Sequence, residues 1–171
     1  MAVVTAVPSA EEVLQVPASW TDEVPQDWID MNGHMNIRHY LDLGGLSTDQ
    51  VIRGLGVDDE YRAHRRMGLF TAEQHLTYLQ EMRLGTSITA HVRVLERSSK
   101  VCHLVALIMD REKDLLACIF ETVLVHVDLD SRRGVAFPDD VAAAYDRLLA
   151  DDHASYSWPA PVCGIMGPRA R

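Results

Sequence analysis

The sequence predicts an α+β fold in which a curved antiparallel sheet encloses one long helix. Apolar residues at the three-to-four spacing of a helix face begin directly after a compact polar turn. The pattern then changes near Met67, where four segments rich in Val, Ile, Leu, Thr and aromatic residues follow one another. One helix followed by a run of strands favours a single sheet packed on that helix. At 171 residues, the chain fits one domain with a core of its own.

The two ends of the chain differ from the middle. Residues 1–18 are small, apolar and interrupted by prolines, so we expect an N-terminal arm ahead of a domain over residues 19–150. Trp20–Ile29 predicts a short, irregular strand. A short final helix is expected over Val141–Leu149, followed by a Pro- and Gly-containing tail over residues 151–171.

The long helix is predicted over residues 36–54, with Asn36 as its N-cap. The three-to-four spacing of one helix face is shown by Ile37, Tyr40, Leu41, Gly44, Thr48, Val51 and Ile52. Gly44 and Gly45 would each cost about 1 kcal/mol relative to alanine in an isolated helix. Their presence indicates that another backbone approaches the helix closely, as when a sheet wraps tightly around it.

Four strands are predicted after the helix: Leu69–Gln80, Thr86–Leu95, Val101–Met109 and Leu115–Val127. The links between them are short, which favours consecutive antiparallel pairing in a meander. The third and fourth segments are almost continuously apolar. We therefore expect them in the centre of the sheet, covered on both faces.

The composition limits the classes of partner. The net charge of -9 argues against general affinity for nucleic acid or an anionic membrane. The N-terminus lacks the pattern of a signal peptide, and no apolar run approaches the roughly 18 residues that span a bilayer, so a cytoplasmic location is expected. Cys102 and Cys118 lie in apolar runs and are expected to be reduced, buried thiols. Together with Cys163 they show no metal-ligand spacing, and no metal site is predicted.

The densest group of functional side chains is Asp27–Asn36, between the first strand and the helix. A helix N-terminus has free N–H groups and a partial positive charge, which suit a carbonyl oxygen that becomes an oxyanion. A carboxylate a few residues upstream could attack the carbonyl carbon or activate water to do so. Residue types and spacing alone fit acyl transfer and a purely structural capped turn equally well.

The motif Asp30-x-x-Gly33-His34-Met35-Asn36, followed by Tyr40-Leu41, resembles that of hotdog-fold acyl-CoA thioesterases of the 4-hydroxybenzoyl-CoA thioesterase type. The resemblance covers residues 19–140. It implies a five-stranded antiparallel sheet wrapped around one central helix. Within that family, the chain is similar to the betainyl-CoA thioesterases of carnitine breakdown. The features of this narrower likeness are Trp28-Ile29-Asp30, Glu73-x-His75, Tyr78-Leu79-x-Glu81, Lys100-x-x-His103, and Glu121 with Leu124-x-His126-Val127-Asp128.

The resemblance implies roles for single residues. Asp30 matches the family's catalytic carboxylate, and Gly33 and His34 match the turn that shapes the site. Asn36 matches the first of two family asparagines. The oxyanion donor is expected at the backbone N–H near Ile37, a position at which many relatives have a second Asn. Asp30, His34 and Asn36 are therefore the predicted catalytic residues, with Gly33 and Ile37 in contact with the substrate.

Glu73 and His75 are two residues apart on a predicted strand and therefore share a face. If that face lines the acyl pocket, both bind substrate, and Glu73 could meet a cationic acyl group. A solvated strand face explains the pattern equally well. His103 and His126 lie in apolar strands and are expected to be hydrogen-bonded core histidines. The cluster Arg62, Arg65 and Arg66 is expected on a solvated face.

The function that the resemblance implies is hydrolysis of a small acyl-CoA, with a betainyl-like acyl group as the narrower expectation. No bound cofactor is required, because coenzyme A arrives with the substrate. The family places the site between two subunits, with the Asp30 loop from one and the strand near Glu73 from the other. A homodimer or a dimer of dimers is therefore expected. Two alternatives remain open: a hotdog-fold acyl-thioester dehydratase and a non-catalytic acyl-CoA-binding protein.

Overall fold

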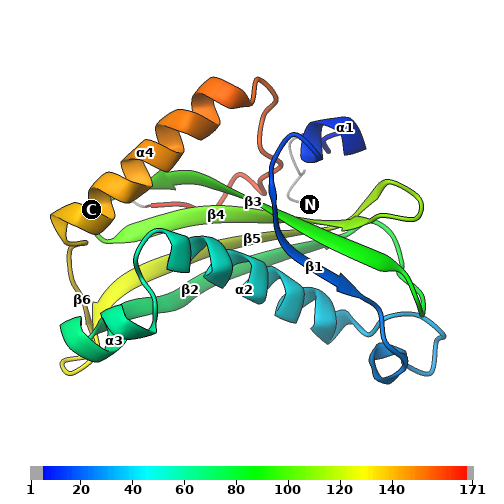
Figure 1. The fold of residues 1–171 in the computed structure, drawn as a ribbon, viewed down its shortest axis with the longest axis horizontal. Coiled ribbons are helices and arrows are strands. Elements are labelled where there is room, and N and C mark those ends of the chain that lie inside the picture. The colour runs from blue at the N-terminus through cyan, green and yellow to red at the C-terminus, as the bar shows by residue number, and fades with distance from the viewer. Residues whose placement is uncertain (1–5, 169–171) are drawn as a thin grey trace.

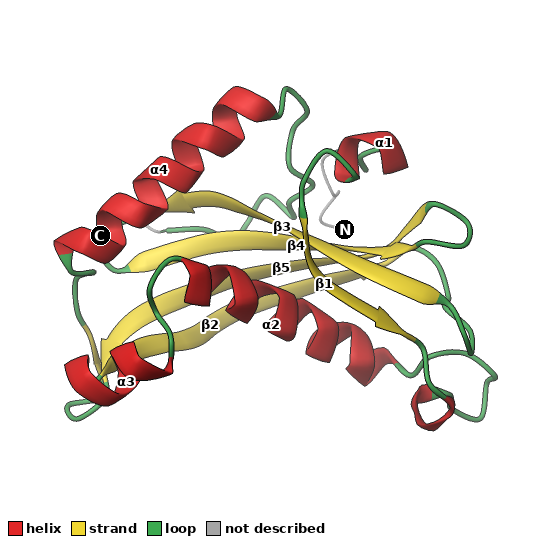
Figure 2. Cartoon of the chain, viewed as in Figure 1, coloured by secondary structure: helices red, strands yellow, loops and turns green. Residues whose placement is uncertain are grey.

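A curled antiparallel sheet holds the long helix α2 (Ile37–Gly54) in the computed structural model, which describes residues 6–168 (Figure 1). The strands are β1 (Ala18–Glu23), β2 (Met67–Tyr78), β3 (Ser87–Arg97), β4 (Val101–Asp110), β5 (Leu115–Asp128) and the two-residue β6 (Arg133–Gly134). The other helices are α1 (Ala10–Val13), the 3-10 turn Gln26–Trp28, α3 (Asp59–Arg65) and α4 (Asp139–Ser155). Figure 2 shows that α2, α4 and the sheet make up most of the fold. The α+β class and the sheet around one helix are confirmed.

The strand order corrects the predicted meander. The order is β1-β3-β4-β5-β2, with β6 paired to β5. β3, β4 and β5 pair consecutively as predicted, but β2 pairs with β5 at one edge of the sheet. The link over residues 79–86 passes the start of α2 instead of closing a hairpin. Within it, Met82 is fully buried and its carbonyl accepts the Met35 N–H at 2.8 Å.

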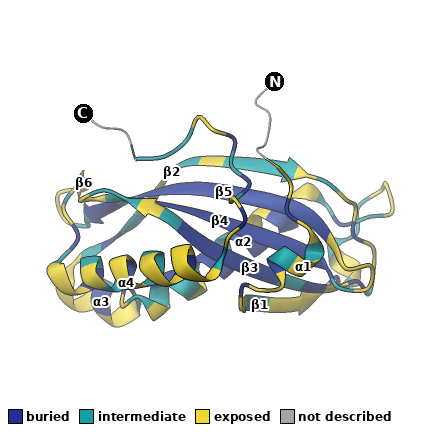
Figure 3. Cartoon of the chain, turned by 90° about the horizontal axis from the view of Figure 1, so that it is seen from above, coloured by how far each residue is buried: buried dark blue, intermediate teal, exposed yellow. Residues whose placement is uncertain are grey.

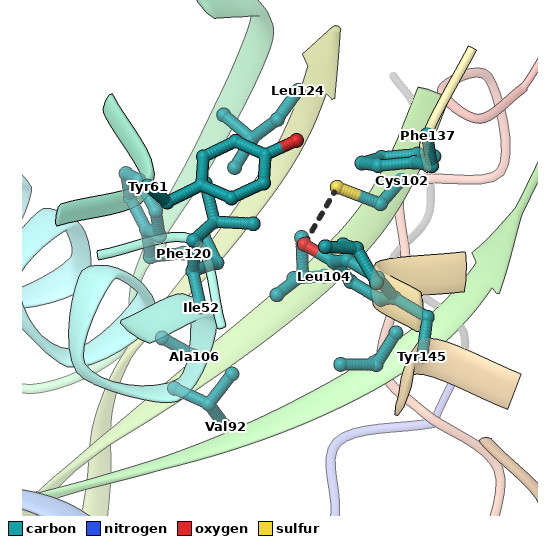
Figure 4. Packing of buried hydrophobic residues seen from close by; sticks show 13 residues of the cluster. Ile52, Tyr61, Val92, Cys102, Leu104, Ala106, Phe120, Leu124, Phe137 and Tyr145 are labelled. Carbon is teal, nitrogen blue, oxygen red and sulfur yellow. Dashed lines mark hydrogen bonds between the residues drawn. The ribbon is translucent and has the colours of Figure 1, made fainter. Parts of the chain in front are cut away.

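The inner face of the sheet packs on α2 and α4. Ile52 of α2, Tyr145 of α4 and Phe120 of β5 belong to one buried cluster, and the Cys102 thiol lies 3.6 Å from the Tyr145 hydroxyl (Figure 4). Gly44 lies directly under Phe120, where a Cβ atom would come within 2.3 Å of the ring. The close approach expected at the two helix glycines is therefore made by a side chain at Gly44. A Cβ at Gly45 would have no atom within 4 Å, so that part of the expectation is wrong.

The outer face of the sheet is covered by the segments near the two ends of the chain. Val13 and Val16 from the first segment and Trp158 from the last pack with Val105 and Leu107 of β4. Figure 3 shows buried strands between α4 and the C-terminal segment. β4 and β5 are buried along almost their whole length, as predicted. The division into arm, domain and tail stays a prediction, and α4 extends beyond the expected helix at both ends.

No helix within residues 6–168 combines the length and the apolar character that crossing a bilayer would require.

Candidate active site

The predicted catalytic turn is a closed loop just ahead of α2. An isolated bridge between Ile29 and Met35 closes its base. Inside the loop, the Asp30 N–H donates to the His34 carbonyl at 3.1 Å, and the Gly33 N–H donates to the Asp30 carbonyl at 3.0 Å. Gly33 has a φ of 79°, a left-handed conformation that glycine adopts without strain. The turn therefore fixes the backbone of Asp30 at the entrance to the helix.

The Asp30 carboxylate is held at both oxygens. Oδ1 accepts the Asn32 N–H at 2.8 Å, and Oδ2 accepts the Asn36 side-chain amide at 3.2 Å. The other end of the Asn36 amide, Oδ1, accepts the Arg38 N–H at 3.1 Å and caps α2, as predicted. Asn36 therefore joins the half-buried carboxylate to the first turn of the helix.

The N–H of Ile37 is the first donor of α2. It has no hydrogen-bond acceptor among the described residues, whereas the next two N–H groups are bound to Asn36. A free N–H at a helix N-terminus attracts negative charge. Ile37 itself is exposed at the protein surface. A carbonyl oxygen bound there would lie close to the turn that carries Asp30.

The link between β2 and β3, over residues 79–86, is hydrogen-bonded to the first turns of α2. The Tyr40 hydroxyl donates to the Gln80 carbonyl at 3.2 Å and accepts the Met82 N–H at 3.2 Å. Burial raises the pKa of Tyr40 to about 12, so the hydroxyl keeps its proton and can serve in both bonds. Sequence reasoning placed Tyr40 on the helix face but gave no role to Gln80 or Met82, because only the tertiary fold brings that link to the helix.

A hollow of about 230 Å³ opens beside Ile37. It is lined by His34, Met35, Ile37, Tyr40, Tyr78, Leu79, Gln80 and Glu81. The rings of Tyr40 and Tyr78 meet edge to face, with centroids 5.3 Å apart. Glu81 supplies a carboxylate, which Arg83 contacts at 2.6 Å; this contact lowers the pKa of Glu81. The hollow thus combines aromatic rings, one acidic group and the candidate oxyanion donor.

Glu73 and His75 are not brought to this hollow. They share a face of β2, as predicted, and lie opposite Val123 and Glu121 of β5. That face is the outer one, because the intervening Gln74 lines a hollow together with Phe120 and residues of α2. Glu73 and His75 therefore do not line the hollow beside Ile37 of their own chain. A pocket to which the strand near Glu73 of a second subunit contributes stays a prediction.

The remaining predicted histidines and arginines have structural contacts. His126 Nε2 lies 2.8 Å from the Tyr61 hydroxyl, and His103 Nε2 lies 2.8 Å from Glu121. Both are buried and hydrogen-bonded, as predicted. The arginine cluster is paired with acidic side chains: Arg62 with Asp49 and Asp59, Arg65 with Asp140, and Arg66 with Asp130.

One group of side chains on the outer face carries metal-ligand atoms. His75, Glu121 and Cys163 each present one such atom, and these three atoms lie within 4.8 Å of one another. Local spacing in the sequence could not reveal the group, because its members come from β2, β5 and the C-terminal segment. It lies on the opposite side of the sheet from α2.

The arrangement around Asp30 can act on a carbonyl group. The Ile37 N–H can hold the carbonyl oxygen, and the carboxylate can attack the carbon or take a proton from water. Both Asp30 oxygens already accept a hydrogen bond, and each keeps a second lone pair for that work.

Comparisons with known proteins show the family and the fold of the chain. A family model described as the thioesterase-like superfamily matches residues 24–145. A betainyl-CoA thioesterase of Pseudomonas aeruginosa is 30% identical over 154 residues, which are 90% of this chain and 96% of that protein.

A protein of Agrobacterium fabrum named L-carnitine dehydrogenase/betainyl-CoA thioesterase is 34% identical over 143 residues. The match covers 84% of this chain but spans only 28% of that protein's length. Among solved structures, a Staphylococcus aureus protein in complex with CoA superposes with a TM-score of 0.74. It is 24% identical, and the match covers 91% of this chain and 97% of that one. At that identity, the likeness concerns the fold.

Proposed function

The chain belongs to the thioesterase-like superfamily, and on that basis we propose that it is a thioester hydrolase that cleaves a small acyl-CoA at Asp30. The products are the free acid and coenzyme A. One observation carries the proposal: a carboxylate is fixed through Asn36 to a helix start whose first N–H has no acceptor among the described residues. A carboxylate beside a preformed oxyanion donor is what thioester hydrolysis requires.

In the proposed reaction, the thioester carbonyl oxygen accepts the Ile37 N–H. Asp30 takes a proton from a water molecule while the water oxygen bonds to the acyl carbon. The tetrahedral intermediate carries its negative charge on the oxygen held at the start of α2. Its collapse breaks the carbon–sulfur bond and releases the coenzyme A thiolate, which takes up the proton. We favour this general-base route because both Asp30 oxygens are held by donors from within the turn and the helix cap.

The alternative is direct attack by Asp30, which would form a mixed anhydride before water releases the acid. A single turnover in heavy-oxygen water separates the two routes. Attack by water puts the label into the acid product at once. Attack by Asp30, followed by attack of water on the Asp30 carbon of the anhydride, puts the label into the enzyme's own carboxylate.

The hollow beside Ile37 favours a small cationic acyl group. The face of Tyr78, which is exposed, can attract a quaternary ammonium, and the Glu81 carboxylate adds opposite charge. The name of the Pseudomonas relative points to the same class of acyl group. Glu73 gives no such support within one chain, because it lies on the outer face. Arg83 forms an ion pair with Glu81 and partly neutralises its charge. We therefore expect the aromatic ring of Tyr78 to contribute most of the preference for a cationic over a neutral acyl group.

Release of free thiol from a panel of acyl-CoAs tests the function and the acyl preference together. We expect betainyl-CoA to be cleaved faster than the neutral tert-butylacetyl-CoA, which has the same shape without the charge. Tyr78→Leu and Glu81→Gln should reduce that preference. Equal turnover of both substrates would remove the charge argument. Absence of thiol release from the whole panel would contradict hydrolysis and favour a dehydratase or a binding protein.

We also propose a homodimer, or a dimer of dimers, in the cytoplasm. β2 is a twelve-residue strand at the edge of the sheet, and a long uncovered edge is a site for pairing. Beside it, α2 exposes Ile37, Leu41 and Leu46 to between 41% and 60%. A second chain that paired along β2 would cover these side chains and close the hollow that opens at Ile37.

A further inference from the structure

The group on the outer face is built from three distant parts of the chain. His75 lies on β2, Glu121 lies opposite it on β5, and Cys163 comes from the segment that follows α4. One Nδ1 or Nε2, one carboxylate oxygen and one Sγ lie within 4.8 Å of one another. Glu121 and Cys163 are buried, and His75 is half-buried. None of the three takes part in the proposed hydrolysis.

From this geometry we infer a second site: His75, Glu121 and Cys163 bind one Zn²⁺ ion or a similar borderline divalent metal. Imidazole nitrogen, carboxylate oxygen and thiolate sulfur are the three ligand types that zinc takes in proteins. A thiolate among them favours zinc over magnesium or calcium, which prefer oxygen ligands. Three protein ligands leave a fourth position for water or an outside ligand.

Hydrogen bonds to neighbouring residues fix the orientation of the Glu121 carboxylate. Glu121 is 1% exposed; its Oε1 lies 2.8 Å from His103 Nε2, and its Oε2 accepts the Cys163 N–H at 2.8 Å. His103 Nδ1 in turn lies 3.3 Å from Glu96. Hydrogen bonds behind a ligand fix its orientation at metal sites. Each Glu121 oxygen keeps a second lone pair, so these bonds leave room for the metal.

A purely structural network does not account for His75. Glu121 is already satisfied by His103 and by the Cys163 N–H. The ring of His75 has no hydrogen-bond partner among the described residues, although it lies directly beside a buried carboxylate and a thiol. Its half-exposed position gives an ion a route from solvent to all three ligands. Metal binding would displace the thiol proton and tie the C-terminal segment to β2 and β5.

A titration of untagged, chelator-treated full-length protein with Co²⁺ tests the inference. Cobalt in a thiolate-containing tetrahedral site gives a sulfur-to-metal absorption band in the near ultraviolet, and equimolar Zn²⁺ should remove it. Loss of a residue that merely orients a ligand costs about 10- to 100-fold in metal affinity. His75→Gln should therefore weaken binding by at least about tenfold, and Cys163→Ser should abolish the band. Cys102 and His64 lie outside the group. Cys102→Ala and His64→Gln should therefore leave the metal affinity and the cobalt band unchanged.

The melting temperature supplies a second readout. Zn²⁺ should raise the melting temperature of the wild type but not that of Cys163→Ser or His75→Gln, because only a ligand bound to the folded state stabilises it. Asp30→Asn should behave as the wild type, so this test is independent of hydrolysis. Absence of the cobalt band in the wild type, or equal binding by Cys163→Ser, would overturn the metal site.

Discussion

The Asp30 carboxylate, the Asn36 amide and the Ile37 N–H lie within eight residues of one another along the chain. Such a short stretch is shaped mainly by its own hydrogen bonds, and for that reason the sequence predicted the turn, the N-cap and the helix start. Their catalytic roles stay predictions. The position of Glu73 and His75 could not be predicted from the sequence. Strand periodicity says that two residues share a face, but only the packing of β2 on β5 decides which face it is.

The buried His126 ring predicts how the free energy of unfolding depends on pH. Its Nδ1 lies 3.0 Å from the Val135 carbonyl, which can only accept, so in the neutral ring Nε2 accepts from the Tyr61 hydroxyl. Burial lowers the pKa of His126 below its ordinary value. The unfolded chain therefore binds the proton more readily as the pH falls through about 6.5. The free energy of unfolding must then decrease toward acidic pH.

Urea unfolding between about pH 7.5 and about pH 5 measures this dependence. His126→Gln removes the titrating ring, so its unfolding free energy should fall less steeply toward acid than that of the wild type. The same substitution at His64, which is exposed on α3, should keep the wild-type slope. The assignment fails if the two variants show the same pH dependence.

At the scale of elements, the sequence predicted α2 and the strands β2 to β5, because each has a strong period or a long apolar run. The first strand was predicted over Trp20–Ile29, but β1 ends at Glu23 and a 3-10 turn follows over Gln26–Trp28. It did not predict that β2 would leave β3 and pair with β5. The eight-residue link over residues 79–86 resembles a hairpin connection in composition. Its actual path depends on the buried side chain of Met82 and on bonds to Met35 and Tyr40. Those are tertiary contacts, which no local pattern contains.

Gly44 is the position at which α2 and the sheet come closest. A methyl group there would lie 2.3 Å from Cγ of Phe120, too close for two carbon atoms. Overpacking of this kind costs about 1–3 kcal/mol, whereas the gain in helix propensity from glycine to alanine is about 1 kcal/mol. Because Cγ is the fixed end of the ring, we expect Gly44→Ala to lower the free energy of unfolding.

Chemical denaturation of two further variants completes this test. Gly54→Ala, at an open position in the same helix, should be neutral or stabilise by up to about 1 kcal/mol. Gly44→Ala combined with Phe120→Leu should recover part of the lost stability, because the smaller side chain can move away. If Gly44→Ala proves as stable as the wild type, the packing of α2 on β5 is not as described.

At the scale of the whole molecule, the free edge of β2 and the apolar side of α2 point to assembly. Light scattering should give twice or four times the chain mass of 19.1 kDa. Leu46→Glu places a charge on the exposed side of α2 and should shift the protein toward monomer. Val7→Glu adds the same charge at an exposed position on the N-terminal segment and should not. A wild-type monomer with full hydrolytic activity would show that one chain is sufficient.

The role of Asp30 is tested most directly by the rate of thiol release from the best acyl-CoA substrate. Asp30→Asn keeps the size of the side chain but removes the base. Loss of a general base typically lowers the rate by about 100- to 10,000-fold. We predict a fall of that size in kcat with a small change in KM in a protein that stays folded, while Asp27→Asn, an exposed acid just before the turn, stays near the wild-type rate. A folded Asp30→Asn protein with near wild-type turnover would contradict the assignment.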